Sequence, residues 1–190
     1  HQPIKRAALE AQFEPERRAP LSIGGWPDAD NAERHFAVEI PGALSFLAFS
    51  DFDAEVKGLL DYPRDEWPNL HLTHISFQIM VGCGFTMLAA RGLAAFLKLR
   101  KQDPYRNIWF QRAAIAAAPL GLIALEAGWI ATEVGRQPWI IRGYLRVSDA
   151  VTPVSGLFGT FLAFTALYIV LSVITVTLLK RHVFSTLEAP

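Results

Sequence analysis

The sequence contains only one cysteine, Cys83, among its 190 residues. A single thiol cannot form a disulfide within the chain, so the fold is not built on a disulfide framework. The net formal charge is zero, and without a basic patch nucleic acid is excluded as a partner. The sequence also lacks a Gly-rich phosphate loop, a Cys-x-x-Cys pair and an internal repeat. These absences argue against a phosphate-loop protein, a Cys-x-x-Cys zinc or dithiol site and a repeat array.

Charged residues are scarce after residue 71, where long apolar runs replace the mixed polar composition of residues 1–70. A helix needs about 20 residues to cross the hydrocarbon core of a bilayer. Three runs reach that length, so we expect an all-α membrane protein with three transmembrane helices, at about 72–97, 108–132 and 156–179. The third run carries no charge, and Pro119 is expected to kink the second.

The polar segment, residues 1–70, precedes the helical part, residues 71–190. Within it, residues 2–14 predict a short helix that begins after Pro3. The apolar stretch 36–49 is too short to span a bilayer, which leaves a re-entrant piece, an interfacial piece or a packed loop core as alternatives. Because the sequence does not begin with Met, we expect the chain to be part of a longer one.

Basic residues near the ends of membrane helices indicate which side faces the cytoplasm. If the three helices alternate in direction, one side of the membrane holds six of these residues: Lys98, Arg100, Lys101, Arg106, Lys180 and Arg181. The opposite side holds Arg136, Arg142 and Arg146, which weakens the bias. The pattern favours a multi-pass protein of a bacterial inner (cell) membrane. Residues 1–70 would then be extracytoplasmic and the C-terminus cytoplasmic.

The second expected helix carries charge where an apolar helix would not need it. Helical spacing places Glu126, Trp129 and Glu133 on one face. A carboxylate at membrane depth can ligate a metal, relay protons or pair with a buried cation. The alternative to a functional role is a structural ion pair with Arg136 or Arg91.

Met80 lies inside the first expected helix, followed by Gly82 and Gly84. A thioether can ligate haem iron, although a Met on an apolar helix usually only packs. Small residues beside it allow close approach of a flat cofactor or of another helix. Lys5 and Glu10 share the short front helix, where a solvated surface pair is the alternative to a functional one. No histidine of this chain completes a haem site with Met80, and Cys83 is expected to be a small core residue.

Several stretches resemble subunit I of the cytochrome bd-type quinol oxidases. The most specific is WIATEVGRQPW, 129–139, and FQIMVGCG, 77–84, is similar to that family's segment around a haem-ligating Met. QPIKRAALE, 2–10, and the stretch 24–50 resemble its quinol-binding loop, and RVSDAVTP, 146–153, resembles the cyanide-insensitive branch. The resemblance covers the whole chain but only the C-terminal part of the family's subunit.

The resemblance implies a role for each matching residue. Met80 matches the axial ligand of a low-spin haem b, whose second ligand is a His outside this chain. Glu133 matches the ligand of a high-spin haem, with Trp129 and Arg136 beside it. Gln78 occupies a cofactor-binding position where some members carry an Arg that faces the haem propionates, so this chain departs from the pattern there.

In the polar segment, Lys5 and Glu10 match the quinol-oxidising residues of the family, and Glu126 is left as a candidate proton relay. The resemblance further implies a terminal oxidase that oxidises ubiquinol or menaquinol and reduces oxygen to water, contributing to a proton gradient without pumping. Its cofactors would be a low-spin haem b, a high-spin haem b, and haem d or haem b at the oxygen site. Its partners would be the lipid bilayer, oxidase subunit II and a small accessory subunit.

Another class of function is compatible with the residues alone. A non-enzymatic haem-binding subunit, or a transporter subunit that relays protons through Glu126 and Glu133, would show the same apolar helices. A reduced-minus-oxidised visible spectrum separates the transporter from the others, because a transporter shows no haem bands.

Overall fold

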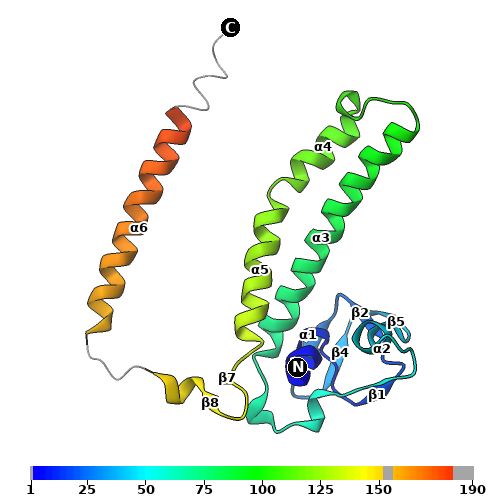
Figure 1. Ribbon diagram of the computed structural model, residues 1–190, viewed down its shortest axis with the longest axis vertical. Helices are drawn as coiled ribbons and strands as arrows, with labels where there is room; N and C mark the ends of the chain where they lie inside the picture. The colour runs from blue at the N-terminus through cyan, green and yellow to red at the C-terminus, as the bar shows by residue number, and fades with distance from the viewer. Residues whose placement is uncertain (1, 152–155, 182–190) are drawn as a thin grey trace. The chain divides into compact units, whose positions relative to one another are not determined.

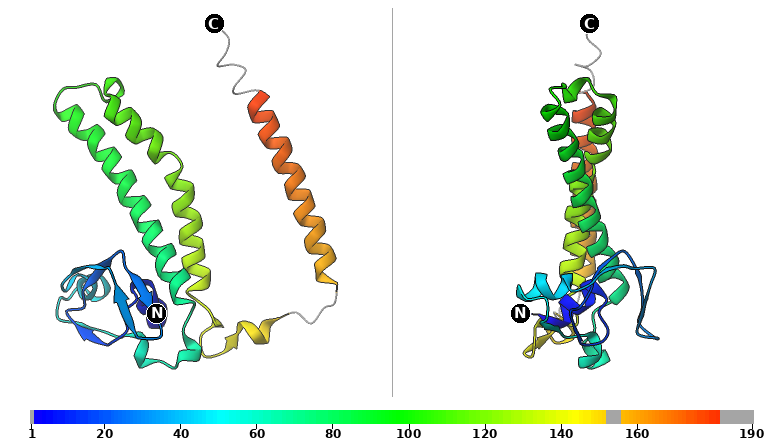
Figure 2. Two further views of the ribbon diagram at one scale, coloured as in Figure 1. Left: turned by 180° about the vertical axis from the view of Figure 1, so that it is seen from behind. Right: turned by 90° about the vertical axis from the view of Figure 1, so that its right-hand side faces the viewer.

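The structure, a computed structural model, describes residues 2–151 and 156–181 of the chain. They belong to two compact units, residues 1–150 and 151–190, coloured from blue to yellow and from yellow to red in Figure 1. The first unit contains the polar segment and two long antiparallel helical stretches, which run side by side in both views of Figure 2. The described residues of the second unit, 151 and 156–181, include one long helix.

The polar segment forms two short helices, α1 and α2, and several very short strands. Its helices are α1, Pro3–Glu10, and α2, Ala43–Phe49. Its strands are β1 (Glu16–Arg17), β2 (Leu21–Ile23), β3 (Trp26–Asp28), β4 (Glu33–His35), β5 (Val38–Ile40) and β6 (Glu55–Val56). They pair antiparallel as β1 with β6, β2 with β5 and β3 with β4. Single 3-10 turns, η1 at Leu59–Asp61 and η2 at Arg64–Glu66, lead into the helical part.

The helical part of the first unit begins with α3, Leu70–Leu99, whose N-terminus is capped by the side chain of Asn69. After the 3-10 turn η3, Pro104–Arg106, the chain returns through α4, Ile108–Ala117, and α5, Leu120–Val134. The helix is interrupted at Pro119, where a proline cannot donate its backbone N–H. The hairpin of β7, Trp139–Ile141, and β8, Leu145–Arg146, and the 3-10 turn η4, Val147–Ala150, end the unit.

The second unit contains α6, Leu157–Leu179, which buries none of its residues within the structure. A helix that is apolar on every side belongs in a bilayer or in the core of a larger assembly. Its threonines are compatible with lipid because the hydroxyl groups of Thr165, Thr175 and Thr177 each donate to the backbone carbonyl four residues earlier.

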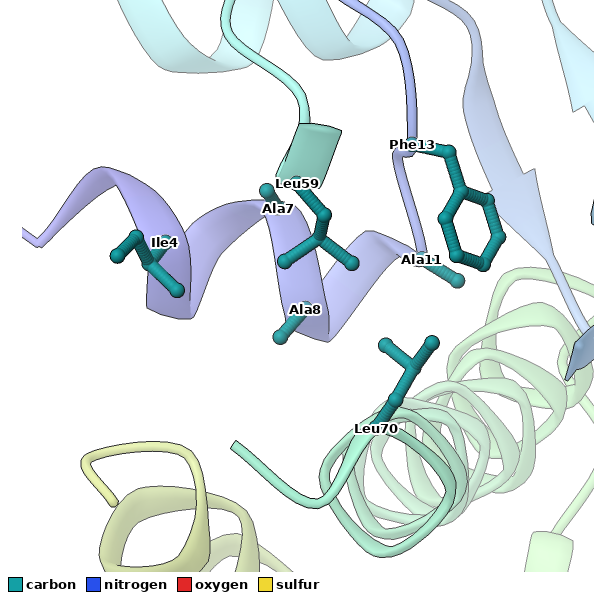
Figure 3. Packing of buried hydrophobic residues seen from close by; sticks show 7 residues of the cluster. All are labelled: Ile4, Ala7, Ala8, Ala11, Phe13, Leu59 and Leu70. Carbon is teal, nitrogen blue, oxygen red and sulfur yellow. The ribbon is translucent and has the colours of Figure 1, made fainter. Parts of the chain in front are cut away.

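A small hydrophobic core fixes α1 to the start of α3. Ala8 on α1 and Ala11, the residue that follows α1, face Leu70, the first residue of α3, and Leu59 covers α1 from the other side (Figure 3). Leu59 and Ala8 have no exposed surface, and Ala7 and Ala11 have 1% each. The alanines of α1 therefore let the polar segment pack closely on the membrane-entry end of α3.

Glycines on α5 and directly after it face α3 at three levels. A Cβ added at Gly135 would lie 3.0 Å from Thr73 Cγ2, one at Gly128 would lie 2.8 Å from Met80 Sδ, and one at Gly121 would lie 4.0 Å from Met87 Sδ. The three glycines are seven residues apart, and so are the three residues of α3 that they face, with the two sets running in opposite directions along the sequence. This is the spacing of knobs-into-holes packing between antiparallel helices, with glycine providing the depth.

The three predicted transmembrane helices are confirmed as helices long and apolar enough to cross a membrane, at Leu70–Leu99, Ile108–Val134 and Leu157–Leu179. The short helix after Pro3 and the break at Pro119 are also confirmed. The all-α expectation holds for these helices, whereas the polar segment and residues 139–146 add strand pairs that were not predicted. The stretch 36–49 becomes β5 and α2. Its Leu44 packs with Ala19 and Val56, so part of it is a packed loop core.

Candidate functional site

Helix α1 lies against the ends of both long helical stretches of the first unit. Lys5 Nζ donates to the carbonyl of Thr132 in the last turn of α5, at 3.3 Å. The carbonyl of Leu9 accepts from His74 in the second turn of α3. The segment that carries Lys5 and Glu10 is therefore fixed between the helix of Met80 and the helix of Glu133.

The Lys5 ammonium lies close to the charges at the end of α5. Burial lowers the pKa of Lys5 from its ordinary value, Arg136 lowers it further, and Glu133 opposes both by raising it. Lys5 and Arg136 line one pocket together with Trp139. Cations at the C-terminal end of a helix also interact favourably with its dipole.

Glu133 lies on the exposed face of α5 together with Trp129 and Glu126. Trp129 is 63% exposed. Among the described residues, the ion pairs include neither Glu126 nor Glu133, and they include neither Arg91 nor Arg136. The ion pair that was the structural alternative for these carboxylates does not form within this part of the chain.

Met80 fills the space above Gly128, with its sulfur directed at α5. Its side chain is partly exposed. Gly82 and Gly84, which were candidates for close approach, face open space, because a Cβ added at either would meet no other atom within 4 Å. Close approach between the helices is provided by Gly128 instead, and α3 stays uncovered beside Gly82 and Gly84.

These residues fit haem iron by the chemistry of their donors and by their access. Glu133 offers an accessible carboxylate without an ion-pair partner in the described ranges, beside an exposed indole. Met80 offers a partly exposed thioether whose three rotatable bonds let the sulfur adjust. A carboxylate can coordinate haem iron through an oxygen atom, and a thioether can coordinate it through its sulfur atom. Groups of three or more His, Cys, Asp or Glu that could hold a separate metal ion are absent from residues 2–151 and 156–181.

Glu10 is buried at the C-terminal end of α1, with 5% of its surface exposed. Burial raises the pKa of its carboxyl to about 7, while a hydrogen bond from the Ser22 backbone and the charge of Arg34 oppose that rise. Arg34 donates to the Glu10 carbonyl at 2.8 Å and pairs with Glu39. A solvated surface pair of Lys5 and Glu10 was the alternative to a functional pair. This alternative is wrong for Glu10, because its carboxyl is buried.

Two polar residues of α3 have contacts that the sequence did not indicate. His74 has no exposed surface. The Gln78 amide, which the resemblance placed near a haem, donates to the Ser22 carbonyl at 3.0 Å and accepts from the Gly24 N–H at 3.1 Å. The only sequence signal for these contacts is their spacing of four residues, which puts both on one side of the helix.

Gly128→Ala is expected to displace the Met80 thioether, because the new Cβ would lie 2.8 Å from Sδ. If Met80 ligates iron, the absorption spectrum of the low-spin haem in the full complex should change. The change would be a partial shift to the high-spin form, with total haem content retained. Gly121→Ala is the matched control, since its Cβ would meet Met87 Sδ at an ordinary 4.0 Å. Both changes raise helix propensity by about the same 1 kcal/mol. Identical spectra for the two variants would contradict the prediction.

The fold and the site define a multi-pass α-helical membrane protein that carries a polar segment packed on the ends of two helical stretches. The family model for cytochrome bd terminal oxidase subunit I matches residues 1–186, and the chain belongs to this family.

Curated relatives agree with the family. The chain is 42% identical over 183 residues to the putative cytochrome bd menaquinol oxidase subunit I of Bacillus subtilis (strain 168), covering 96% of this chain and 41% of that protein. It is 28% identical over 216 residues to the cytochrome bd-II ubiquinol oxidase subunit 1 of Escherichia coli (strain K12), covering 78% of this chain and 42% of that protein. The chain therefore spans about two fifths of the length of the relatives it matches.

A solved structure, the bd oxidase from Geobacillus thermodenitrificans, is similar with a TM-score of 0.80 and 40% identity. The match covers 95% of this chain and 41% of that one. The family predicted from the residue motifs is thereby confirmed. The assignment of 146–153 to the cyanide-insensitive branch stays a prediction, and residues 152 and 153 lie outside the described residues.

Proposed function

We propose that this chain is part of a quinol:oxygen oxidoreductase in a bacterial inner membrane, which oxidises ubiquinol or menaquinol and reduces oxygen to water. The residues of the polar segment would take electrons and protons from quinol on the extracytoplasmic side. Protons for water would come from the cytoplasmic side, so a proton gradient would form without pumping. The subunit would work with oxidase subunit II and a small accessory subunit.

The observation that carries this proposal is the position of α1. Lys5 on α1 reaches the last turn of α5 at Thr132, next to Glu133. Four residues along α1 from Lys5, the Leu9 carbonyl is bonded to α3, the helix of Met80. A substrate bound at Lys5 and Glu10 would therefore lie beside both helices that we propose to hold haem.

Each residue then has a chemical role. Quinol loses protons as it loses electrons, and the buried Glu10 carboxylate can accept a proton from a quinol hydroxyl. Its pKa of about 7 suits a base that works near neutral pH. The Lys5 ammonium can donate a hydrogen bond to a quinol oxygen. Met80 and Glu133 would each ligate a haem iron, Trp129 and Arg136 would lie beside the haem of Glu133, and Glu126 would relay protons.

When bound, the haems supply one-electron transfer and oxygen reduction, which no side chain of this chain can perform. We propose a low-spin haem b at Met80, a high-spin haem b at Glu133 or nearby, and haem d or haem b at the oxygen site. The protein controls them through ligand identity, burial and nearby charge.

Glu10→Gln tests the quinol site because it preserves shape and removes the base. We expect the turnover number for quinol oxidation to fall by about a hundredfold, within the range for loss of a general base. The wild-type rate should rise with pH through about 7, as Glu10 loses its proton. The variant should lose this dependence. Steady-state oxygen consumption with quinol at several pH values measures both effects.

Lys5→Ala should raise the apparent KM for quinol more than it lowers turnover, because Lys5 is proposed to bind the substrate rather than to accept its proton. Glu14→Gln provides a control for Glu10→Gln, since Glu14 is an exposed carboxylate of the same segment. Unchanged turnover and unchanged apparent quinol affinity in both Lys5→Ala and Glu10→Gln would rule out the proposed quinol site.

A further inference from the structure

The side of α3 that faces the polar segment carries three polar side chains, at positions 71, 74 and 78. His71 contacts the ring of Trp26, with ring centroids 5.3 Å apart. The Nδ1–H of His74 donates to the carbonyl of Leu9 at 2.7 Å, across 65 residues of sequence. Gln78 makes two hydrogen bonds with the backbone of β2 and of the turn after it, donating to the Ser22 carbonyl and accepting from the Gly24 N–H.

Two of these contacts converge on the surroundings of Glu10. Leu9, held by His74, directly precedes Glu10 in α1. Ser22, whose carbonyl accepts from Gln78, has its backbone close enough to the Glu10 carboxylate to lower the pKa of that carboxyl. The backbone on two sides of the Glu10 carboxyl is therefore held, in the last turn of α1 by His74 and in β2 by Gln78. Both of these side chains come from α3.

The burial of these groups makes the contacts important. His74 and Ser22 have 0% and 3% of their surface exposed, so water from bulk solvent cannot replace a lost hydrogen bond there. Both the nitrogen and the oxygen of the Gln78 side-chain amide bond to the backbone of the polar segment. Gln78 lies one helical turn after His74 on α3. Hydrogen bonds between buried partners fix geometry more strictly than exposed ones, because an unpaired buried group costs free energy.

We propose that His74 and Gln78, which lie on the same helix as Met80, are positioning residues. They hold Glu10 of α1 in the position in which it would oxidise quinol. The inference rests on the proposed role of Glu10 and adds to it. Neither residue touches the substrate. Each fixes a backbone group beside Glu10, and a displacement of about 1 Å at a reacting group can cost up to a hundredfold in rate.

The test measures how fast quinol reduces the haems of the full oxidase complex in a stopped-flow instrument. His74→Leu and Gln78→Leu remove the hydrogen bonds and are expected to slow this reduction at least tenfold. The spectrum after reduction by dithionite, which does not require the quinol site, should match that of the wild type. His74→Asn keeps a donor near the position of Nδ1, so it should restore the rate to within about twofold of the wild type.

Two controls separate this inference from a general loss of stability. Gln111→Leu removes an amide hydrogen bond that is exposed and lies far from Glu10, from Nε2 to the carbonyl of Tyr105 at 2.6 Å, near the start of α4. It should leave the rate unchanged. Glu10→Gln provides the reference for a quinol site that has lost its base.

Wild-type rates in both leucine variants, together with a slow Glu10→Gln, would overturn the inference and leave the quinol site intact. A wild-type rate in Glu10→Gln would overturn the proposed function of Glu10, and this inference with it. If His74→Asn were as slow as His74→Leu, the hydrogen bond to Leu9 would not be the cause. Loss of haem in the leucine variants would also overturn the inference, because it would show a role in folding.

Discussion

Replacing Glu133 by alanine is expected to remove a high-spin haem from the full oxidase complex. Glu133 is exposed on α5, and in the described part of the chain it has no ion-pair partner to account for its charge. Ferric haem iron would provide that partner. Removal of a ligand carboxylate should therefore lower the haem-to-protein ratio by one haem, with loss of the matching high-spin bands.

The matched control is Glu126→Ala, two helical turns earlier on the same exposed face of α5. It removes another exposed carboxylate and should leave the haem content whole. Glu133→Gln keeps an oxygen donor and should retain part of the haem with an altered spectrum. A full haem complement with normal high-spin bands in Glu133→Ala would contradict the ligand role of Glu133.

Replacing Met80 by leucine is expected to convert the low-spin haem to a high-spin form or to remove it. Leucine conserves the volume of methionine, and such a swap in a core usually costs less than about 1.5 kcal/mol. Leucine lacks the sulfur that would ligate iron. The expected spectral change therefore reports on the ligand rather than on the packing above Gly128. The reduced visible spectrum of the purified complex measures it.

Met87→Leu is the control, because Met87 lies one heptad further along α3 and faces Gly121 as Met80 faces Gly128. It changes the same chemical group in the same packing arrangement and should leave the low-spin bands unchanged. Equal spectra for Met80→Leu and Met87→Leu would show that Met80 only packs. The haem ligand would then lie elsewhere in the complex.

The helical part of the fold could be predicted because its signal is local. Each span needs only length and the near-absence of charge, and the observed α6, Leu157–Leu179, begins within one residue of the expected position. The strand pairs could not be predicted, since strands of two or three residues contain no measurable alternation. The glycine series on α5 is visible in the sequence. Its partners on α3 depend on the register set by the connection between α3 and α4, which spacing alone does not give.

The candidate site residues also differ in whether their evidence is local in the sequence or depends on long-range contacts. Glu133 could be proposed as a site residue from its chemistry, because a carboxylate in an apolar helix is unusual, whereas the proposal for Met80 depends on the family resemblance; both stay predictions. His74 could not be recognised as buried, because the groups that cover it include Leu9, 65 positions away in the sequence. Gln78 was placed near a cofactor by the family resemblance, whereas its amide in this chain is bonded to Ser22 and Gly24. Long-range contacts of this kind require the folded polar segment.

The most direct test of the central claim is a visible difference spectrum of the purified complex that contains this chain, with quinol as the reductant. We expect the absorption bands of reduced haem to appear when quinol is added without oxygen and to disappear when air is admitted, with oxygen consumed. A complex without haem bands would contradict the oxidase function and favour a proton-relaying transporter. Haem bands that dithionite develops but quinol does not would instead favour a haem-binding subunit without quinol oxidase activity.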